Sequence, residues 1–171
     1  MRSEQVKGLP LIVGTLALTA QGCFFPPDPS PWVGVAKQYR HNPRSLTQQT
    51  LALRDATVIA ERARALKYIS QGRYEATPAD QAWAVLGLWQ LSIRTSEGWP
   101  IGQSDWSYDE RSLEMAARNA LFDDAAVRAA FRQLGPALSP GLEREAWQSL
   151  RASLDRFHPD ASAPATAPLS N

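Results

Sequence analysis

Residues 77–95 read TPADQAWAVLGLWQLSIRT, and this stretch decides the fold. Thr77 is suited to cap the N-terminus of a helix, Pro78 fits its first position, and Asp80 in the first turn complements the helix dipole. The residues that follow are apolar on nearly all sides, which is typical of a helix surrounded by other elements. The sequence therefore predicts a central, buried helix over about residues 78–95.

Helical periodicity continues on both sides of this segment. Before it, apolar residues recur at helical spacing over residues 45–70. Asn42-Pro43 or Ser45 can cap this helix, Ser45 and Gln48 match a capping box, and Gly72 supplies a stop signal. After it, no segment alternates in polarity as a strand would. We expect an all-α domain over residues 42–157, a small bundle of four or five helices. The last three of these helices are predicted at about residues 108–122, 124–134 and 140–157. Ala116, Ala117 and Ala120 are expected to face inward in the first of them, and Asp123 or Asp124 is expected to start the second.

The segments that flank this domain lack the pattern of a packed core. Residues 23–41 contain four prolines within a few positions, and proline fixes φ and removes a hydrogen-bond donor, so this stretch is predicted to be an extended, Pro-rich tether. A Pro-rich stretch can also be a ligand for a partner's aromatic groove. Residues 158–171 are mainly Ala, Pro, Ser and Thr and are predicted to be a disordered tail.

The N-terminus has the pattern of a signal peptide over residues 1–22. Arg2 and Lys7 precede the apolar run LPLIVGTLALTA, which is too short for a comfortable membrane span of roughly 20 residues. The run ends at Ala20-Gln21-Gly22-Cys23, which resembles the lipobox of bacterial lipoproteins. That resemblance covers residues 1–23 alone. It implies cleavage before Cys23 and lipidation of this cysteine, for example with palmitate.

Three alternatives to a lipidated Cys23 follow from the residues. Signal peptidase could cut after Ala20, the leader could persist as an uncleaved anchor, or Cys23 could be a buried apolar thiol. The family usually has leucine where Ala20 stands. The resemblance also implies a location, because aspartate after the cysteine often retains lipoproteins in the inner membrane. Phe24 stands there, so the outer membrane, on its periplasmic face, is the expected place.

Composition excludes several function classes. Without residues 1–22 the chain carries equal numbers of basic and acidic side chains, so it has no global positive field for an obligatory nucleic-acid partner. With one cysteine, Cys23, no internal disulfide can form. The two histidines, His41 and His158, lie in segments predicted to be unstructured, so we expect no metal site. No phosphate loop or nucleophile elbow occurs, and neither a cofactor nor enzymatic activity is expected.

The most unusual loop is residues 97–108, EGWPIGQSDWSY, which packs three aromatics and two carboxylates between two predicted helices. Its candidate binding residues are Trp99, Asp105, Trp106 and Tyr108, which together resemble a platform for a sugar ring. In the structural alternative the two tryptophans fold back over the end of the bundle while the acidic groups cap helices or face solvent. Two carboxylates can also perform acid–base chemistry when they lie at a defined separation.

Two further patterns have ordinary structural explanations. Trp83 to Gly87 resembles the opening of a tetratricopeptide-repeat helix, but no second copy occurs at the required spacing, so Gly87 is expected to allow close helix packing. Basic residues gather on and after the end of the 45–70 helix. They are expected to form a solvated face that matches the negative end of the helix dipole; they are Arg62, Arg64, Lys67 and Arg73.

The leader, the tether and the helical domain together indicate where the protein is located, and they indicate no particular reaction or ligand. The expected function is that of a membrane-anchored, periplasm-facing lipoprotein, acting as an accessory, scaffold or adaptor of an envelope assembly such as a secretion, pilus or conjugation system. Its expected partners are the membrane, through lipidated Cys23, and an envelope protein. The alternative is a lipoprotein that binds glycan or peptidoglycan through the loop over residues 97–108.

Overall fold

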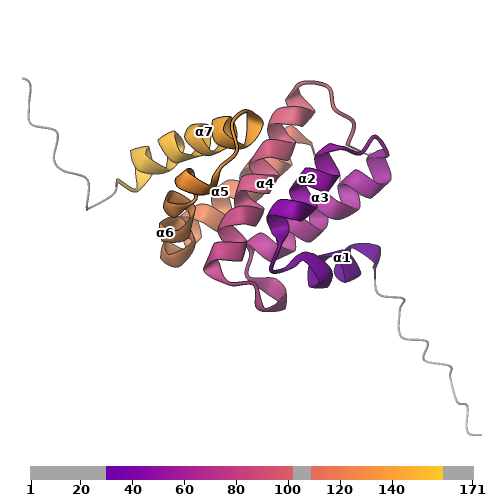
Figure 1. Cartoon of the computed structure of the whole chain (residues 1–171), viewed down its shortest axis with the longest axis horizontal. Coiled ribbons are helices and arrows are strands. Elements are labelled where there is room, and N and C mark those ends of the chain that lie inside the picture. The colour runs from indigo at the N-terminus through magenta and orange to yellow at the C-terminus, as the bar shows by residue number, and fades with distance from the viewer. Residues whose placement is uncertain (1–29, 102–108, 160–171) are drawn as a thin grey trace, which may run out of the picture.

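The computed structural model describes residues 30–101 and 109–159, and this part of the chain is all-α (Figure 1). The predicted class is confirmed, with seven α-helices in place of four or five and no strand in these two ranges. The predicted signal peptide, Cys23 and tail residues 160–171 lie outside the described residues. The helices are α1 (Pro31–Tyr39), α2 (Pro43–Leu51), α3 (Ala56–Ser70), α4 (Pro78–Ser96), α5 (Glu110–Asp123), α6 (Ala125–Gln133) and α7 (Leu142–Phe157), with 3-10 turns η1 (Arg73–Glu75) and η2 (Gly135–Ala137).

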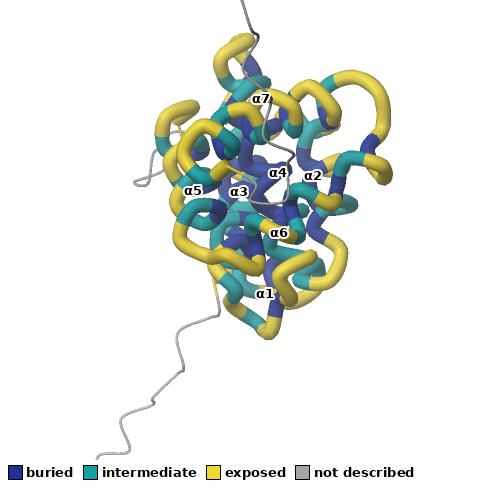
Figure 2. The backbone as a smooth tube through the Cα atoms, turned by 90° about the vertical axis from the view of Figure 1, so that its left-hand side faces the viewer, coloured by how far each residue is buried: buried dark blue, intermediate teal, exposed yellow. Residues whose placement is uncertain are grey.

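Helix α4 is the centre of the domain, as predicted. It contacts α2, α3, α5, α6 and α7, and every residue from Ala84 to Ser92 is buried. Figure 2 shows this buried stretch inside a shell of exposed turns. The predicted start is also confirmed: the Thr77 hydroxyl accepts a hydrogen bond from the Asp80 amide at 3.2 Å, and the Asp80 carboxylate accepts one from the Thr77 amide at 2.9 Å. Local capping and burial by its neighbours therefore act together on α4.

The single helix predicted for residues 45–70 is wrong, because the chain forms α2 and α3 with a break at residues 52–55. Asp55 caps α3, and its carboxylate accepts hydrogen bonds from the amides of Thr57 and Val58 at 2.9 and 3.1 Å. An N-cap residue leaves helical backbone geometry, so Asp55 starts a new helix instead of continuing the previous one. The apolar spacing runs through the break because both helices contact α4.

The extended tether predicted for residues 23–41 is wrong for residues 31–39, which form α1. Pro31 occupies the first turn, where its fixed φ and missing donor favour a helix start, and no further proline follows within the helix. The Trp32 ring stacks on Tyr68 of α3 with ring centroids 4.5 Å apart and planes 12° apart. Ala36 is fully buried. Packing against α3 thus gives α1 a place in the domain, which begins before the predicted residue 42.

The later helices follow the prediction with shifted starts. Helix α5 begins at Glu110 and not at residue 108, because the Asp109 carboxylate accepts a hydrogen bond from the Ser112 amide at 2.7 Å and so acts as the cap. Asp124 caps α6, as one of the two predicted candidates. Helix α7 begins after Gly141 and not at residue 140, since Gly141 has a φ of 91°, outside the helical region.

A pH-dependent contact joins the α1–α2 turn to α4, where His41 Nδ1 lies 2.9 Å from the Asp80 carboxylate. Burial alone would raise the pKa of Asp80, but hydrogen bonds with His41 and Thr77 outweigh it and hold that pKa below its ordinary value of 3.8. The carboxylate's contribution to the free energy of unfolding is therefore complete above the unfolded-state pKa. It is lost as the pH falls through the lowered pKa of the folded state.

We predict that acid destabilises the wild-type protein more steeply than Asp80→Asn. In the wild type, the stabilisation by the Asp80 carboxylate is lost from about pH 4 downward. The amide of the variant cannot titrate, so the variant lacks this stabilisation at every pH. Urea unfolding of both proteins at a series of acidic pH values measures the difference. The gap between the two free energies of unfolding should be widest near neutral pH and should close in acid. Parallel curves would contradict the prediction.

Candidate functional site

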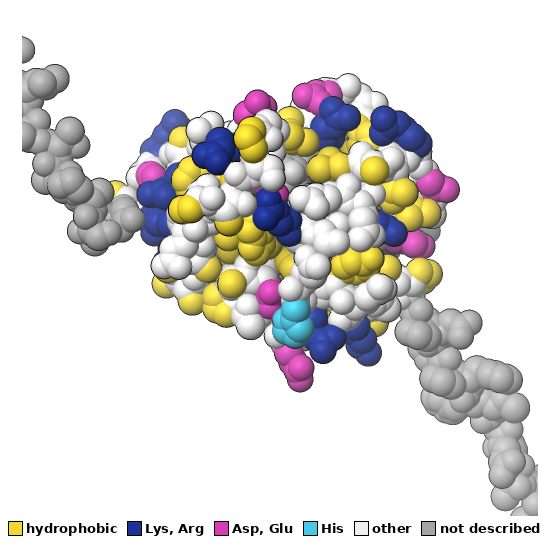
Figure 3. All heavy atoms as spheres, viewed as in Figure 1, with side chains coloured by type: hydrophobic (Ala, Val, Ile, Leu, Met, Phe, Trp, Pro, Cys, Tyr) yellow, Lys and Arg dark blue, Asp and Glu magenta, His cyan; other side chains and the backbone are white. Residues whose placement is uncertain are grey.

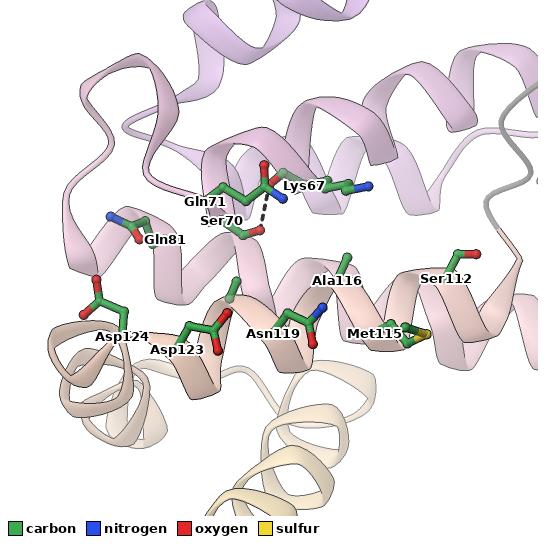
Figure 4. Close-up of a pocket in the computed structure, with 11 residues that line it drawn as sticks. Lys67, Ser70, Gln71, Gln81, Ser112, Met115, Ala116, Asn119, Asp123 and Asp124 are labelled. Carbon is green, nitrogen blue, oxygen red and sulfur yellow. Dashed lines mark hydrogen bonds between the residues drawn. The ribbon is translucent and has the colours of Figure 1, made fainter.

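A solvent-open groove runs between the C-terminal end of α3, the start of α4 and the outer face of α5 (Figure 4). Its volume is about 560 Å³. We call it the α3–α5 groove. It is lined by Lys67, Ser70, Gln71, Gln81, Ser112, Met115, Ala116, Asn119, Ala120, Asp123 and Asp124.

Small side chains on α5 explain why the groove exists. Ala116 and Ala120 were predicted to face inward, and they do face α3, but both remain partly exposed on the floor of the groove. Ala117, which follows Ala116, is fully buried. A methyl group is too short to fill the space between two helices. Alanines at helical spacing on α5 therefore indicate an open groove here, and not close helix packing alone.

The groove offers polar groups from both walls. Gln71 lies on the α3 side and Asn119 on the α5 side, and neither side chain has a hydrogen-bond partner in the part of the chain that the structure describes. By contrast, the Ser70 hydroxyl donates to the Lys67 carbonyl at 2.8 Å, and the Gln81 amide donates to the Ala76 carbonyl at 3.2 Å. Two unpaired carboxamides can each donate and accept, as a peptide backbone requires.

The two ends of the groove differ in charge and polarity. Lys67 lies towards the end formed by Ser112 and Met115, whereas the two aspartates lie at the other end (Figure 4). The Met115 side chain is 53% exposed, and methionine is a flexible side chain common at adaptable binding surfaces. Asp124 is occupied as the cap of α6. The groove thus combines an adaptable apolar contact with a charge gradient.

Trp99 of the predicted binding surface lies in the core. It is 7% exposed, and its indole N–H donates to the Leu53 carbonyl at 3.1 Å, across the break between α2 and α3. This position fits the structural alternative for the loop, in which Trp99 folds back over the end of the bundle. Asp105, Trp106 and Tyr108 lie outside the described residues. Any contribution they make to binding stays a prediction, as does lipidation of Cys23.

The predicted basic face at the end of α3 has an aromatic component that the sequence did not reveal. The Arg64 guanidinium lies 4.6 Å from the Trp32 ring centroid, and that of Arg73 lies 4.5 Å from the Tyr68 ring centroid. Because Trp32 stacks on Tyr68, the four side chains form one column that joins α1, α3 and η1. Sequence periodicity gave no hint of this column, since α1 was not predicted to be a helix.

The described part of the chain is thus an all-α domain with a solvent-open groove between α3 and α5. Comparison of the chain with protein-family models, curated proteins and solved structures gives no match. Over residues 30–101 and 109–159, no helix is long and apolar enough to cross a membrane, and no cluster of His, Cys, Asp or Glu could hold a metal ion.

Proposed function

We propose that this chain is a lipoprotein anchored through Cys23 at the outer membrane, facing the periplasm, where its helical domain is an accessory or adaptor protein of an envelope assembly. Examples of such an assembly are a secretion, pilus or conjugation system. The α3–α5 groove carries the adaptor part of this proposal. The anchor rests on the sequence of residues 1–23, in particular on the lipobox that ends at Cys23.

The lining of the groove favours a peptide segment of a partner protein as the occupant. Gln71 and Asn119 line the groove, and their carboxamides have no hydrogen-bond partner among the described residues, so they can match the donors and acceptors of an extended backbone. Met115 and the two alanines below it provide an apolar strip for side chains. Sugar sites commonly use an aromatic ring as a platform, and none of the described residues that line this groove is aromatic.

Glycan binding through the loop remains the alternative, and it rests on Trp106 and Tyr108 of the sequence. The buried ring of Trp99 gives it no support. Titration of the protein with peptidoglycan fragments tests it through tryptophan fluorescence. A saturable change that Trp106→Ala abolishes would favour the glycan over the peptide.

Site-specific photocrosslinking in living cells tests the adaptor proposal. We expect a photoreactive residue at Asn119 to give one discrete adduct with an envelope protein. The same residue at Gln148, exposed on α7, is the matched control and should give none. Ala116→Arg adds a long side chain over the groove floor and should abolish the adduct from position 119. Equal adducts from both positions, or an adduct that survives Ala116→Arg, would contradict the proposal.

The mass of the intact, membrane-extracted protein tests the anchor separately. We expect a chain that begins at residue 23 and carries the additional mass of its acyl groups, because two or three chains are needed for firm membrane attachment. Cys23→Ser should leave the protein in the soluble fraction of the envelope extract. An unmodified cysteine in the wild-type protein would rule out the anchor and leave the groove experiment unaffected.

A further inference from the structure

A second, smaller pocket lies between the C-terminal end of α1 and η1. Its volume is about 310 Å³, and it is lined by Lys37, Arg40, Tyr74 and Glu75. We call it the α1 pocket. Arg73 adjoins it and stacks on Tyr68 of the aromatic column. Figure 3 shows Lys and Arg side chains at the lower edge of the molecule, near α1 of Figure 1, beside Asp or Glu side chains and a histidine.

The charges around the α1 pocket are not neutralised within the domain. Among the described residues, neither the Lys37 ammonium nor the Glu75 carboxylate forms an ion pair or a hydrogen bond. The Arg40 guanidinium donates from Nη1 to the Lys37 carbonyl, while its Nε is buried and has no partner. Two cations therefore face one carboxylate, which favours an anionic ligand.

The backbone of η1, which forms the wall of the pocket opposite α1, has a conformation of raised energy. Tyr74 and Glu75 have φ values of 60° and 64°, so two consecutive residues other than glycine occupy the left-handed region. Strained residues of this kind persist only where the surrounding structure holds them, and they cluster at ligand-binding and other functional sites. The strained turn brings both side chains to the pocket. This observation is independent of the charges.

The position of the pocket along the chain indicates what surface it meets. Seven residues separate Cys23 from Pro31 at the start of α1, and fully extended they span at most about 25 Å. Helix α1 adds roughly 14 Å along its axis, at 1.5 Å for each of its nine residues. A lipid on Cys23 therefore keeps the α1 pocket within about 40 Å of the point of attachment, so the pocket can reach the headgroups.

We propose that the α1 pocket binds the phosphate of an anionic phospholipid headgroup, and that the basic face of α1 and η1 thereby rests on the membrane surface. The proposal rests on the proposed function in one respect, because lipidation of Cys23 supplies the proximity. Lys37 and Arg40 contact the phosphate, through the Lys37 ammonium and the terminal nitrogens of the Arg40 guanidinium. Glu75 opposes binding and limits it, so the domain lies on the surface reversibly.

Binding to lipid vesicles by the mature chain, residues 23–171 with Cys23→Ser, tests the proposal without any contribution from an acyl chain. We expect binding to vesicles of phosphatidylcholine that contain phosphatidylglycerol and none to phosphatidylcholine alone. Lys37→Gln with Arg40→Gln should weaken binding about thirtyfold, the equivalent of about 1 kcal/mol for each cation removed. Glu75→Gln should strengthen binding, because it removes the opposing charge.

The matched control is Arg111→Gln with Arg156→Gln, which removes the same net charge from exposed positions on α5 and α7. It should leave vesicle affinity nearly unchanged. If the two double variants lost equal affinity for the vesicles, the proposal would be overturned, since net charge alone would then explain the loss. Displacement from vesicles by millimolar glycerol phosphate would overturn it too, by assigning the pocket to a free phosphate. The mass of Cys23 and the vesicle result are independent, so either proposal can fail alone.

Discussion

Glu143→Ala is expected to lower the free energy of unfolding by about 3–5 kcal/mol, the largest effect of any single substitution that we predict. Glu143 stands in the first turn of α7, and only 9% of its side chain is exposed. Its two carboxylate oxygens accept hydrogen bonds from Nε and Nη2 of Arg44 at 2.9 and 2.8 Å. The backbone amide of Ser139 donates a third at 2.7 Å.

The size of the effect follows from what the substitution leaves behind. Arg44 would keep its charge at a site where it is 31% exposed, 4.7 Å from the Trp83 ring centroid, with no carboxylate to pair with. The Ser139 amide would also lose its acceptor. Removing one partner of a buried ion pair costs more than the pair itself contributes, because the remaining charge is poorly solvated. The contact joins α2 to α7, so its loss should loosen the packing between these two helices.

Glu145→Ala is the matched control, since Glu145 lies in the same first turn of α7 but is exposed. It should change the free energy of unfolding by less than about 0.5 kcal/mol. Glu143→Gln keeps the shape and part of the hydrogen bonding, so its effect should fall between the two. Urea denaturation measures the free energy of unfolding of all three variants. The comparison holds where the dependence of that free energy on urea concentration is the same as in the wild type. If Glu143→Ala lies within about 1 kcal/mol of Glu145→Ala, the ion pair does not hold α2 to α7.

Gly87→Ala is expected to destabilise the protein by about 1–3 kcal/mol, although alanine is the better helix former. Gly87 lies in the middle of α4, and a Cβ at this position would lie 2.2 Å from Oγ1 of Thr47 on α2. Thr47 is buried, and its hydroxyl donates to the Pro43 carbonyl at 2.9 Å, so it cannot turn away at no cost. Helix α2 would have to move off α4.

A double-mutant cycle identifies this contact as the cause. Thr47→Ala removes Oγ1 and Cγ2, so the double variant should be more stable than the sum of the two single changes predicts. Gly34→Ala is the control for helix propensity, because a Cβ at Gly34 in α1 meets no atom within 4 Å. It should raise stability by about 0.5–1 kcal/mol. Stabilisation by both alanines would show that α2 and α4 do not approach closely at Gly87.

The close contact at Gly87 also bears on the tetratricopeptide-like pattern of α4. A glycine at this position has a packing purpose within the single domain, since it admits Thr47 of α2. No repeat is needed to explain Trp83 either, because its ring lies against the Arg44 guanidinium. Gly87 was predicted to allow close helix packing, and its proximity to Thr47 fits that prediction.

Prediction from sequence succeeded where the signal was local. The predicted Thr77 cap, Pro78 at the first position and the continuous apolar run after them placed α4 within a residue or two of its observed bounds. Asp124 was a predicted candidate for the cap of α6, and it fills that role. Capping groups and apolar residues act within one or two helical turns, so a single stretch of sequence contains all that is needed to recognise them.

The candidate site was hardly predictable for the opposite reason. Trp99 was the only predicted binding residue among the described ones, and its indole instead bonds the Leu53 carbonyl, 46 positions earlier in the chain. The groove depends on how far α5 stands from α3. Met115 and Asn119 carry no motif that would mark them in the sequence. Their position becomes informative only when the neighbouring helix is known.

By itself, the sequence determined the all-α class, the central place of α4 and the caps that begin it, because these depend on residues a few positions apart. The tertiary structure alone decided that α1 folds onto α3 through Trp32 and Tyr68, and that Arg44 meets Glu143 across 99 positions. It also decided where a groove stays open. Periodicity reports which side of a helix is apolar, but not which helix that side meets, since that choice depends on the combined packing of all the helices.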